Sequence, residues 1–248
     1  MSNSAPPSPA PFSPQAKSGH LSVCTLASGS KGNAIYFSDG ETRILVDAGL
    51  SGREIERRMG ERQLSAADLD AILVTHEHSD HIQGVGVLAR RFKIPVHITS
   101  RTAQAGGGRL GKVAELVHFR CGTPFQIGGL EIHPFATAHD AADSAGFTVC
   151  GGGCKAGIAT DLGIATELVK RHLEGCRLLI LEANHDPQML IEGPYPWPLK
   201  QRIRGRNGHL SNAQCRDLLG DILHDGLEHV ILAHLSENNN TPAHALNT

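Results

Sequence analysis

The sequence predicts a mixed α/β (α+β) fold in which two β-sheets pack face to face and helices cover their outer sides. Two observations carry this prediction. Short apolar runs bounded by Gly, Ser and Asp occur in two groups along the chain, and each group is joined by segments with helical periodicity. A sheet sandwich with outer helices buries the apolar faces of both kinds of element. The 248 residues, 40% of them hydrophobic, are enough for one large core.

The first half of the chain contains six predicted strands and two predicted helices. Apolar runs bounded by turn residues predict strands at 21–27, 33–38, 42–49, 70–75, 94–100 and 114–119. A serine N-cap and charges at helical spacing predict a helix over 51–64, and a second helix is predicted over 82–92. We expect the glycine-rich residues 105–111 to form a loop.

The second half repeats this organisation. Strands are predicted at 124–137, 145–150, 155–160, 177–183 and 228–236, and helices at 163–173 and 211–226. Residues 1–19 are rich in Pro and Ser and are predicted to be a disordered tail, because they bury little apolar surface. Residues 20–248 are predicted to be the folded domain.

Composition narrows the class of protein. Lys plus Arg (23) nearly balances Asp plus Glu (25), so any contact with nucleic acid must come from a local patch. No apolar run approaches the ~18 residues of a membrane span, and no membrane partner is predicted. The six scattered cysteines, without a C-x-x-C pair or a signal-peptide pattern, predict a reducing cytoplasm. Histidine is abundant (15 residues), which points to a metal or acid–base site.

The densest cluster of ligand-type residues is THEHSDH at 75–81, directly after the apolar run AILV. His76 and His78 are two apart on an extended segment, so their side chains point the same way and can hold one metal ion. Asp80 and His81, at the start of the following helix, can turn towards a second ion. The segment lacks the H-E-x-x-H spacing of a helical zinc-protease site.

Two metal ions need more ligands than one loop supplies, and three further candidates follow apolar strands. His139 follows LEIHPFAT, Asp161 follows KAGIAT and His234 follows EHVILA. Each alone would be interpreted as an ordinary turn residue. Their shared position at strand ends favours the interpretation that they are metal ligands. An aspartate between two cations can bridge them, and Asp161 is the expected bridge.

These motifs, in this order, resemble the metal motifs of the metallo-β-lactamase superfamily, whose fold is a four-layer αββα sandwich with a two-metal site. Over about residues 20–242 the chain closely resembles the YycJ/WalJ-type exonuclease family. The segments that carry this resemblance are LASGSKGN (26–33), LVDAGLS (45–51), THEHSDHIQG (75–84), ATAHDA (136–141), ATDLG (159–163), LEANHD (181–186), GPYPWPLKQRI (193–203), GHLSN (208–212) and HLSENN (234–239).

The resemblance implies a metal-dependent phosphodiesterase, and most specifically a 5′ exonuclease acting on double-stranded DNA. It implies two divalent ions, Zn or Mn, because the ligand types suit both metals. Chains of this type continue after the last motif with a further helix, and residues 241–246 are expected to be the part of that helix present here.

The resemblance also suggests residue roles. In tRNA 3′-processing enzymes of the superfamily, a histidine placed like His209 steadies the scissile phosphate or protonates the leaving oxygen, and a glutamate placed like Glu182 orients it. Asp80 counts among the catalytic residues as well as the ligands. Two cations lower the pKa of a shared water, so the expected nucleophile is a metal-bridging hydroxide. Asp47, which ends a strand, is expected to be a buried acceptor that orients a ligand histidine.

Four basic side chains lie within seven residues, close to His209. They are expected to contact the backbone of a nucleic acid, most specifically DNA. The alternative is that they form a solvated helix end. They are Lys200, Arg202, Arg204 and Arg206. Two other functions stay open: an RNA-processing or small cyclic-phosphate phosphodiesterase, and a non-catalytic metal-binding regulatory protein. A purely structural metal needs neither His209 nor Glu182, which favours an enzyme.

Overall fold

The computed structural model describes residues 20–248, so the predicted tail at 1–19 lies outside the described residues. The strands are β1 (Ser22–Ala27), β2 (Ala34–Ser38), β3 (Arg43–Val46), β4 (Ala71–Leu73), β5 (Val96–Thr99), β6 (Leu116–Phe119), β7 (Phe125–Ile127), β8 (Leu130–Ala136), β9 (Ala145–Gly151), β10 (Cys154–Ala159), β11 (Leu178–Glu182) and β12 (His229–Ala233). The helices are α1 (Gly52–Glu61), α2 (Ser79–Ile82), α3 (Val85–Phe92), α4 (Ser100–Leu110), α5 (Glu167–Leu173), α6 (Pro187–Glu192), α7 (Trp197–Arg204), α8 (Asn212–Ile222) and α9 (Pro242–Asn247), with a short 3₁₀ turn at Ala66–Asp68.

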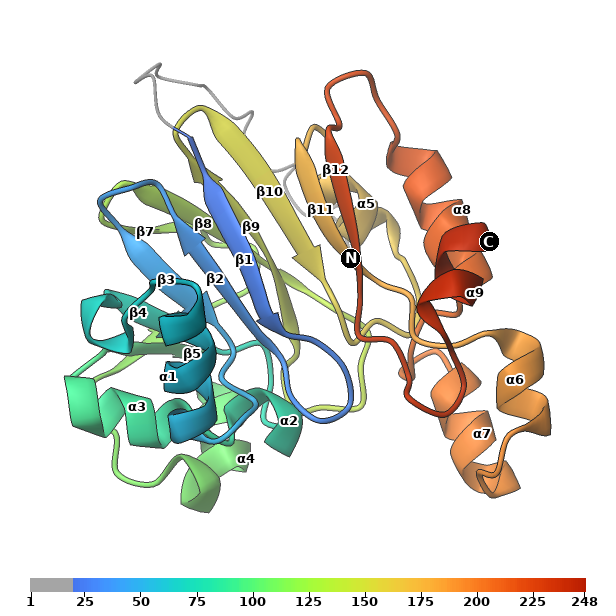
Figure 1. Ribbon diagram of the computed structural model, residues 1–248, viewed down its shortest axis with the longest axis horizontal. Coiled ribbons are helices and arrows are strands. Elements are labelled where there is room, and N and C mark those ends of the chain that lie inside the picture. The colour runs from blue at the N-terminus through green and yellow to red at the C-terminus, as the bar shows by residue number, and fades with distance from the viewer. Residues whose placement is uncertain (1–19) are drawn as a thin grey trace, which may run out of the picture.

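The strands form two six-stranded sheets, one from each half of the chain (Figure 1). In the first sheet the order is β1-β2-β3-β4-β5-β6, antiparallel from β1 to β3 and parallel from β3 to β6. In the second sheet the order is β12-β11-β10-β9-β8-β7, antiparallel from β7 to β10 and parallel from β10 to β12. The two halves therefore have the same plan, as the sequence predicted.

Three apolar clusters separate four layers. One lies between the first sheet and helices α1 and α3, and it includes Ile55 and Leu88. A second lies between the two sheets, where Phe37 and Phe147 are fully buried. A third, which includes Leu173 from α5 and Leu218 from α8, lies behind the second sheet. This arrangement confirms the predicted αββα sandwich.

The central strands are apolar on both faces because each face meets another layer. In β2, Ile35 and Phe37 belong to the cluster between the sheets, whereas Ala34 and Tyr36 belong to the cluster under the helices. Such strands appear in sequence as continuous apolar runs rather than as alternating patterns. The segments that follow β4, β8, β10 and β12 bring their histidine and aspartate side chains close together.

Two predicted elements differ from the structure. The prediction of a loop at 105–111 is wrong, because α4 extends through these glycines to Leu110. Thr99 caps this helix, and Gly106 packs so closely that a Cβ there would lie 3.3 Å from the Ile82 side chain. The single strand predicted at 124–137 is instead the hairpin β7–β8, which turns at Gly128 with a φ of 53°.

Two short helices, α6 and α7, were not predicted, and both have a proline in the first turn. Pro187 is in the first turn of α6 and Pro198 in the first turn of α7, where a missing N–H costs no helical hydrogen bond. Residues 241–246, expected to be part of a helix, lie mostly within α9, which begins at Pro242 and packs on the second sheet's outer core through Ala245. No helix between residues 20 and 248 is long and apolar enough to cross a membrane.

Candidate metal centre

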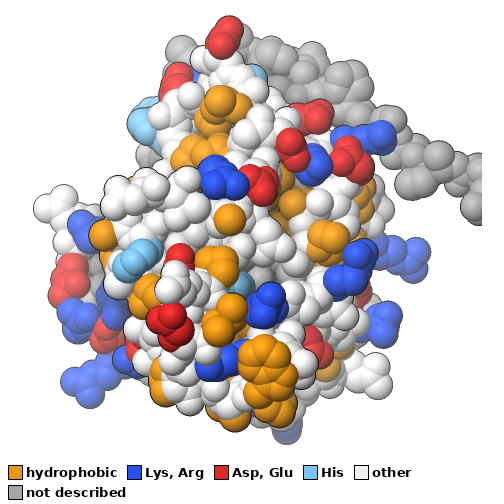
Figure 2. All heavy atoms as spheres, turned by 90° about the vertical axis from the view of Figure 1, so that its right-hand side faces the viewer, with side chains coloured by type: hydrophobic (Ala, Val, Ile, Leu, Met, Phe, Trp, Pro, Cys, Tyr) orange, Lys and Arg blue, Asp and Glu red, His pale blue; other side chains and the backbone are white. Residues whose placement is uncertain are grey.

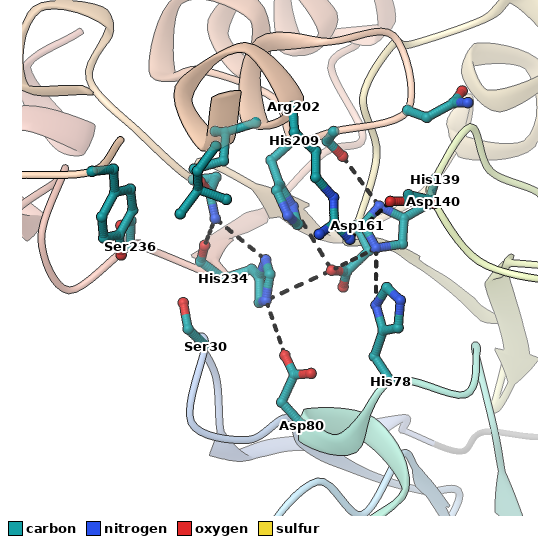
Figure 3. Close-up of a pocket in the computed structure, with 16 residues that line it drawn as sticks. Ser30, His78, Asp80, His139, Asp140, Asp161, Arg202, His209, His234 and Ser236 are labelled. Carbon is teal, nitrogen blue, oxygen red and sulfur yellow. Dashed lines mark hydrogen bonds and ion pairs between the residues drawn. The ribbon is translucent and has the colours of Figure 1, made fainter. Parts of the chain in front are cut away.

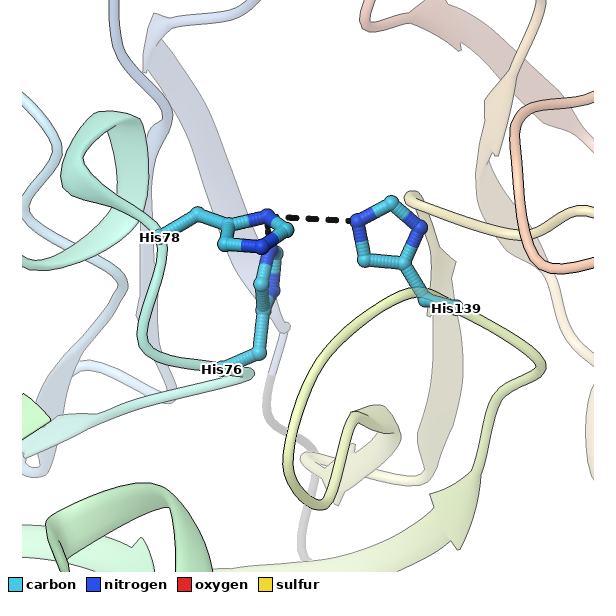
Figure 4. Close-up of side chains that lie close together, drawn as sticks. All are labelled: His76, His78 and His139. Atoms are coloured by element: carbon cyan, nitrogen blue, oxygen red, sulfur yellow. Dashed lines mark hydrogen bonds between the residues drawn. The ribbon is translucent and has the colours of Figure 1, made fainter. Parts of the chain in front are cut away.

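Three histidines form the first group of ligand-type side chains (Figure 4). His76 and His78 lie in the loop after β4, and His139 follows β8. His76 Nε2 lies 3.0 Å from His78 Nδ1, which lies 3.3 Å from His139 Nε2. His139 Nδ1 donates to the Gly208 carbonyl oxygen at 3.1 Å, so its Nε2 is free to face the other two rings.

The second group consists of Asp80 and His81 from α2 and His234 from the end of β12. Asp80 Oδ2 lies 3.5 Å from His81 Nε2 and 3.7 Å from His234 Nε2. Both imidazoles are buried, whereas the Asp80 side chain is partly exposed. The group therefore opens towards solvent on the Asp80 side.

Asp161 lies between the two groups. Its Oδ2 is 3.2 Å from His81 Nε2, and its Oδ1 is 3.6 Å from His139 Nε2 and 3.7 Å from His234 Nε2. Burial alone would raise the pKa of this carboxyl, but the charges of His234 and His81 hold it well below its ordinary value. Asp161 is thus a buried anion in contact with histidines of both groups.

Three acidic or histidine residues at strand ends have left-handed backbone conformations. Asp47, Asp161 and His234 have φ angles of 60°, 55° and 54°. Asp and His tolerate this region better than β-branched residues do, although it still costs on the order of 1 kcal/mol each. Strain of this kind concentrates at functional sites, where it directs a side chain out of the line of its strand.

Asp47 lies behind His81, on the side away from Asp161. Its Oδ1 accepts the Thr75 backbone N–H at 2.9 Å, and its Oδ2 accepts the Thr75 hydroxyl at 2.8 Å. The same Oδ2 is 2.8 Å from His81 Nδ1. The contact occupies Nδ1 and directs Nε2 towards the shared site, which is the arrangement that the predicted orienting role requires. The Asn33 side-chain amide also lies 3.1 Å from this Nε2.

Glu182 connects His209 to His234. Its Oε1 lies 2.7 Å from His209 Nδ1 and 2.8 Å from His234 Nδ1, while its Oε2 accepts the backbone N–H groups of Leu162 and Leu210. Burial opposes its ionisation, but the charge and hydrogen bonds of His209 and His234 lower the pKa of Glu182 to about 2. Because both oxygens are engaged, Glu182 holds the two imidazoles rather than a metal ion.

These side chains fit divalent ions. A tetrahedral ion with ligands at ~2.0–2.1 Å separates its ligand atoms by roughly 3.3 Å, close to the spacings in both groups. His234 Nε2 is buried without a hydrogen-bond partner, although it faces oxygens of Asp80 and Asp161. A buried polar atom in this state needs a partner that the described residues do not supply, and a cation would satisfy it.

A cavity of about 230 Å³ opens onto both groups (Figure 3). His78, Asp80, His139, Asp161 and His234 line it, and His209 lies beside them, with its ring 5.1 Å from that of His139 and 5.2 Å from that of His234. Other parts of the wall include Ser30 from the loop after β1, Tyr195 from the link between α6 and α7, Arg202 from α7 and Ser236 from the segment after β12. The cavity brings seven predicted ligands and His209 to one place in the fold, with His76 and His81 buried beneath its lining.

The predicted basic segment is not one patch. The prediction that Lys200 faces a substrate is wrong, because its ammonium donates to the carbonyl oxygens of Ile191 and Gly193 and its side chain is 8% exposed. Arg202 lines the cavity, whereas Arg204 and Arg206 are exposed outside its lining. On this side of the molecule Lys and Arg side chains are dispersed among acidic and apolar ones (Figure 2).

Two residues that support the site were not predicted. Glu77 Oε1 accepts the Ala142 backbone N–H at 2.8 Å, which ties the loop of His76 to the loop after His139. Ser28 Oγ accepts the backbone N–H of His234 at 2.7 Å. Their partners lie 65 and 206 residues away, so no local pattern in the sequence could have revealed these contacts.

The fold and the clustered ligands define a protein of the metallo-β-lactamase fold. Residues 42–234 match the family model of the beta-lactamase superfamily domain. The architecture is similar to the crystal structure of the metallo-β-lactamase fold protein YhfI from Bacillus subtilis, with a TM-score of 0.74, 18% identity, and coverage of 93% of this chain and 91% of that one.

Closer relatives come from the sequence. The chain is 39% identical to exodeoxyribonuclease YycJ of Bacillus anthracis over 89% of this chain and 84% of the relative. It is 38% identical to exodeoxyribonuclease WalJ of Streptococcus pneumoniae over 87% of this chain and 81% of the relative. Within the beta-lactamase superfamily, the chain therefore belongs to the family of these YycJ and WalJ proteins, and the resemblance seen in its motifs is confirmed.

Proposed function

We propose that this protein is a metal-dependent nuclease that removes nucleotides from an end of double-stranded DNA, most specifically a 5′ exonuclease. The observation that carries the proposal is the convergence of two ligand groups on Asp161, at a cavity that His209 also lines. The relatives at 38–39% identity are named exodeoxyribonucleases, which supports DNA as the substrate.

Two divalent ions, zinc or manganese, are the proposed cofactors. His76, His78 and His139 would hold one ion, Asp80, His81 and His234 would hold the other, and Asp161 would contact both. When bound, such ions lower the pKa of water towards neutrality and stabilise negative charge on a phosphodiester.

His209 is the proposed acid for the leaving oxygen. Its Nδ1 is engaged by Glu182, so the proton available to a substrate is the one at Nε2. Although burial lowers it, the pKa of His209 is raised overall, chiefly because the Glu182 carboxylate stabilises the protonated ring. A protonated His209 can steady a phosphate oxygen and deliver its proton as the P–O bond breaks.

We also propose that the protein works in a reducing compartment such as the cytoplasm. All six cysteines are free thiols. Burial raises the pKa of four of them, Cys121, Cys150, Cys176 and Cys215, to between about 11 and about 12, which keeps these thiols protonated and unreactive.

A substrate panel tests the proposal. Metal-loaded protein is incubated with double-stranded DNA labelled at either end, with single-stranded RNA and with a chromogenic phosphodiester, before and after chelation. The proposal predicts metal-dependent release of nucleotides from the DNA, with 5′-end label released first. Preference for RNA or for the small diester would support the corresponding phosphodiesterase instead. Metal binding without turnover of any substrate would identify a regulatory protein.

A further inference from the structure

Arg202 is the one Lys or Arg among the described residues that line the cavity beside the metal centre. It extends from α7 to the side of the cavity where His209 and Asp140 lie (Figure 3). Helix α7 leads directly into the histidine, because the His209 backbone N–H donates to the Ile203 carbonyl oxygen at 2.9 Å. The guanidinium and the proposed acid therefore belong to one continuous wall.

The guanidinium is paired with a carboxylate that has no place in the metal centre. Arg202 Nη2 lies 2.8 Å from Asp140 Oδ2. Asp140 follows His139 directly, and its backbone N–H donates to the Asn207 carbonyl oxygen at 3.0 Å. This hydrogen bond, with that of His139 to Gly208, joins the two loops and sets Asp140 opposite Arg202.

We infer that the Arg202 guanidinium binds a substrate phosphate in this cavity. Without substrate, the Asp140 carboxylate pairs with this guanidinium, and the phosphate displaces the carboxylate. The inference rests on the proposed function and adds the residue pair that selects for a phosphate. A guanidinium presents a planar fork of donors that matches phosphate oxygens in two parallel hydrogen bonds. The contact with Asp140 is an ion pair in which one carboxylate oxygen, Oδ2, lies 2.8 Å from Nη2.

The pair is well suited to exchange. The two side chains are 60% and 57% exposed, and an ion pair with that exposure contributes little to stability. Breaking the Asp140–Arg202 ion pair therefore costs little free energy, and the Asp140 carboxylate can turn to solvent. Until then it repels phosphate, because two anions compete for one cation.

The test is the affinity of the metal-loaded protein for inorganic phosphate and for thymidine 5′-monophosphate, measured by calorimetry. The variants are Arg202→Gln, Asp140→Asn and the double variant. The exposed pair Arg216–Asp217 on α8 is joined at 2.7 Å and lies outside this cavity, so Arg216→Gln and Asp217→Asn are matched controls. Circular dichroism checks that each variant is folded.

We expect Arg202→Gln to weaken binding of both probes by about 10-fold, since a charge-assisted hydrogen bond is lost. Asp140→Asn should strengthen binding by about 3-fold or more when Arg202 is present, and it should leave binding unchanged when combined with Arg202→Gln, because its effect acts through the guanidinium. The control variants should not change affinity.

Three results would overturn the inference: no phosphate binding by the wild type, weaker binding in Asp140→Asn, or the same gain from Asp140→Asn with and without the Arg202 guanidinium. The last result would mean a general charge effect. If phosphate binds as expected but no nucleic acid is cleaved, the pair stands and the proposed nuclease function fails.

Discussion

Three of the five proposed ligand histidines are held through the nitrogen that faces away from the shared site. Asp47 contacts Nδ1 of His81, and Glu182 contacts Nδ1 of His234. The Gly208 carbonyl oxygen contacts Nδ1 of His139. Each contact directs Nε2 of the ring towards the shared site, where a cation can bind. The partners behind the ligands therefore determine how well the site binds a metal.

Replacing Asp47 with Asn should weaken metal binding by about 10–100-fold, because the amide no longer supplies the negative charge that orients and polarises His81. Activity should return at high metal concentration. The measurement is a competition titration with a chromogenic chelator, with the exposed variant Asp225→Asn as the control. Unchanged affinity in Asp47→Asn would mean that Asp47 serves only to fasten Thr75.

Replacing His209 with Ala should leave both ions bound and lower kcat by about 100-fold or more, because a general acid is lost while no ligand is. Elemental analysis and turnover of double-stranded DNA, measured on the same sample, check this. Loss of metal together with activity would identify His209 as a ligand, and full activity would make it structural.

Among the helices and strands, the helices that the sequence failed to predict contain prolines or several glycines. Ligand positions at strand ends were predictable, because an apolar run followed directly by His or Asp places that side chain at a sheet edge. Helices α6 and α7 were missed because their prolines occupy first turns, and α4 was missed because tertiary packing accommodates glycines that disfavour an isolated helix.

The glycines of α4 give a test of that packing. A Cβ at Gly107 or Gly108 would meet nothing within 4 Å, whereas one at Gly106 would press on Leu110 and Ile82. The double variant Gly107→Ala/Gly108→Ala should raise the free energy of unfolding by about 1–2 kcal/mol, because alanine loses less backbone entropy in a helix.

Urea denaturation of this variant and of Gly106→Ala makes the comparison. Gly106→Ala should give no gain, because its new methyl group lacks room. If Gly106→Ala stabilised the protein as much as each substitution in the double variant does on average, α4 would be loosely packed.

For the whole molecule, sequence order alone indicated two similar halves and the chain order of the ligands, but not the contacts that join the halves. The pairs Glu77–Ala142 and Ser28–His234 connect the two halves, and the Arg202–Asp140 pair connects two distant segments of the second half. Lys200 shows the converse: its neighbours in sequence suggested a phosphate contact, but the fold buries its ammonium against two carbonyl groups.

The stability of the whole domain should depend on pH through buried histidines. His172 stacks on Phe135 in the apolar cluster behind the second sheet. Burial lowers the pKa of His172 to about 4, with a smaller contribution from the charge of Lys155. Because the unfolded chain takes up a proton near pH 6.5 and the folded chain does not, stability is complete above that pH and falls as the pH drops towards 4.

Replacing His172 with Phe keeps the stacking and removes the titration. Between pH 7 and pH 5 the free energy of unfolding should fall by about 1–2 kcal/mol less in the variant than in the wild type. Denaturant melts at both pH values, with equal metal loading, check this. Equal losses in the two proteins would mean that His172 is also protonated in the folded state.

We propose that two ions held on either side of Asp161 make this domain a nuclease. The measurement that tests it most directly is the initial rate of nucleotide release from double-stranded DNA as chelated protein is titrated with zinc or manganese. We expect no release without metal and a rate that rises until two equivalents per chain are bound. Release that survives chelation, or that saturates at one equivalent, would contradict it.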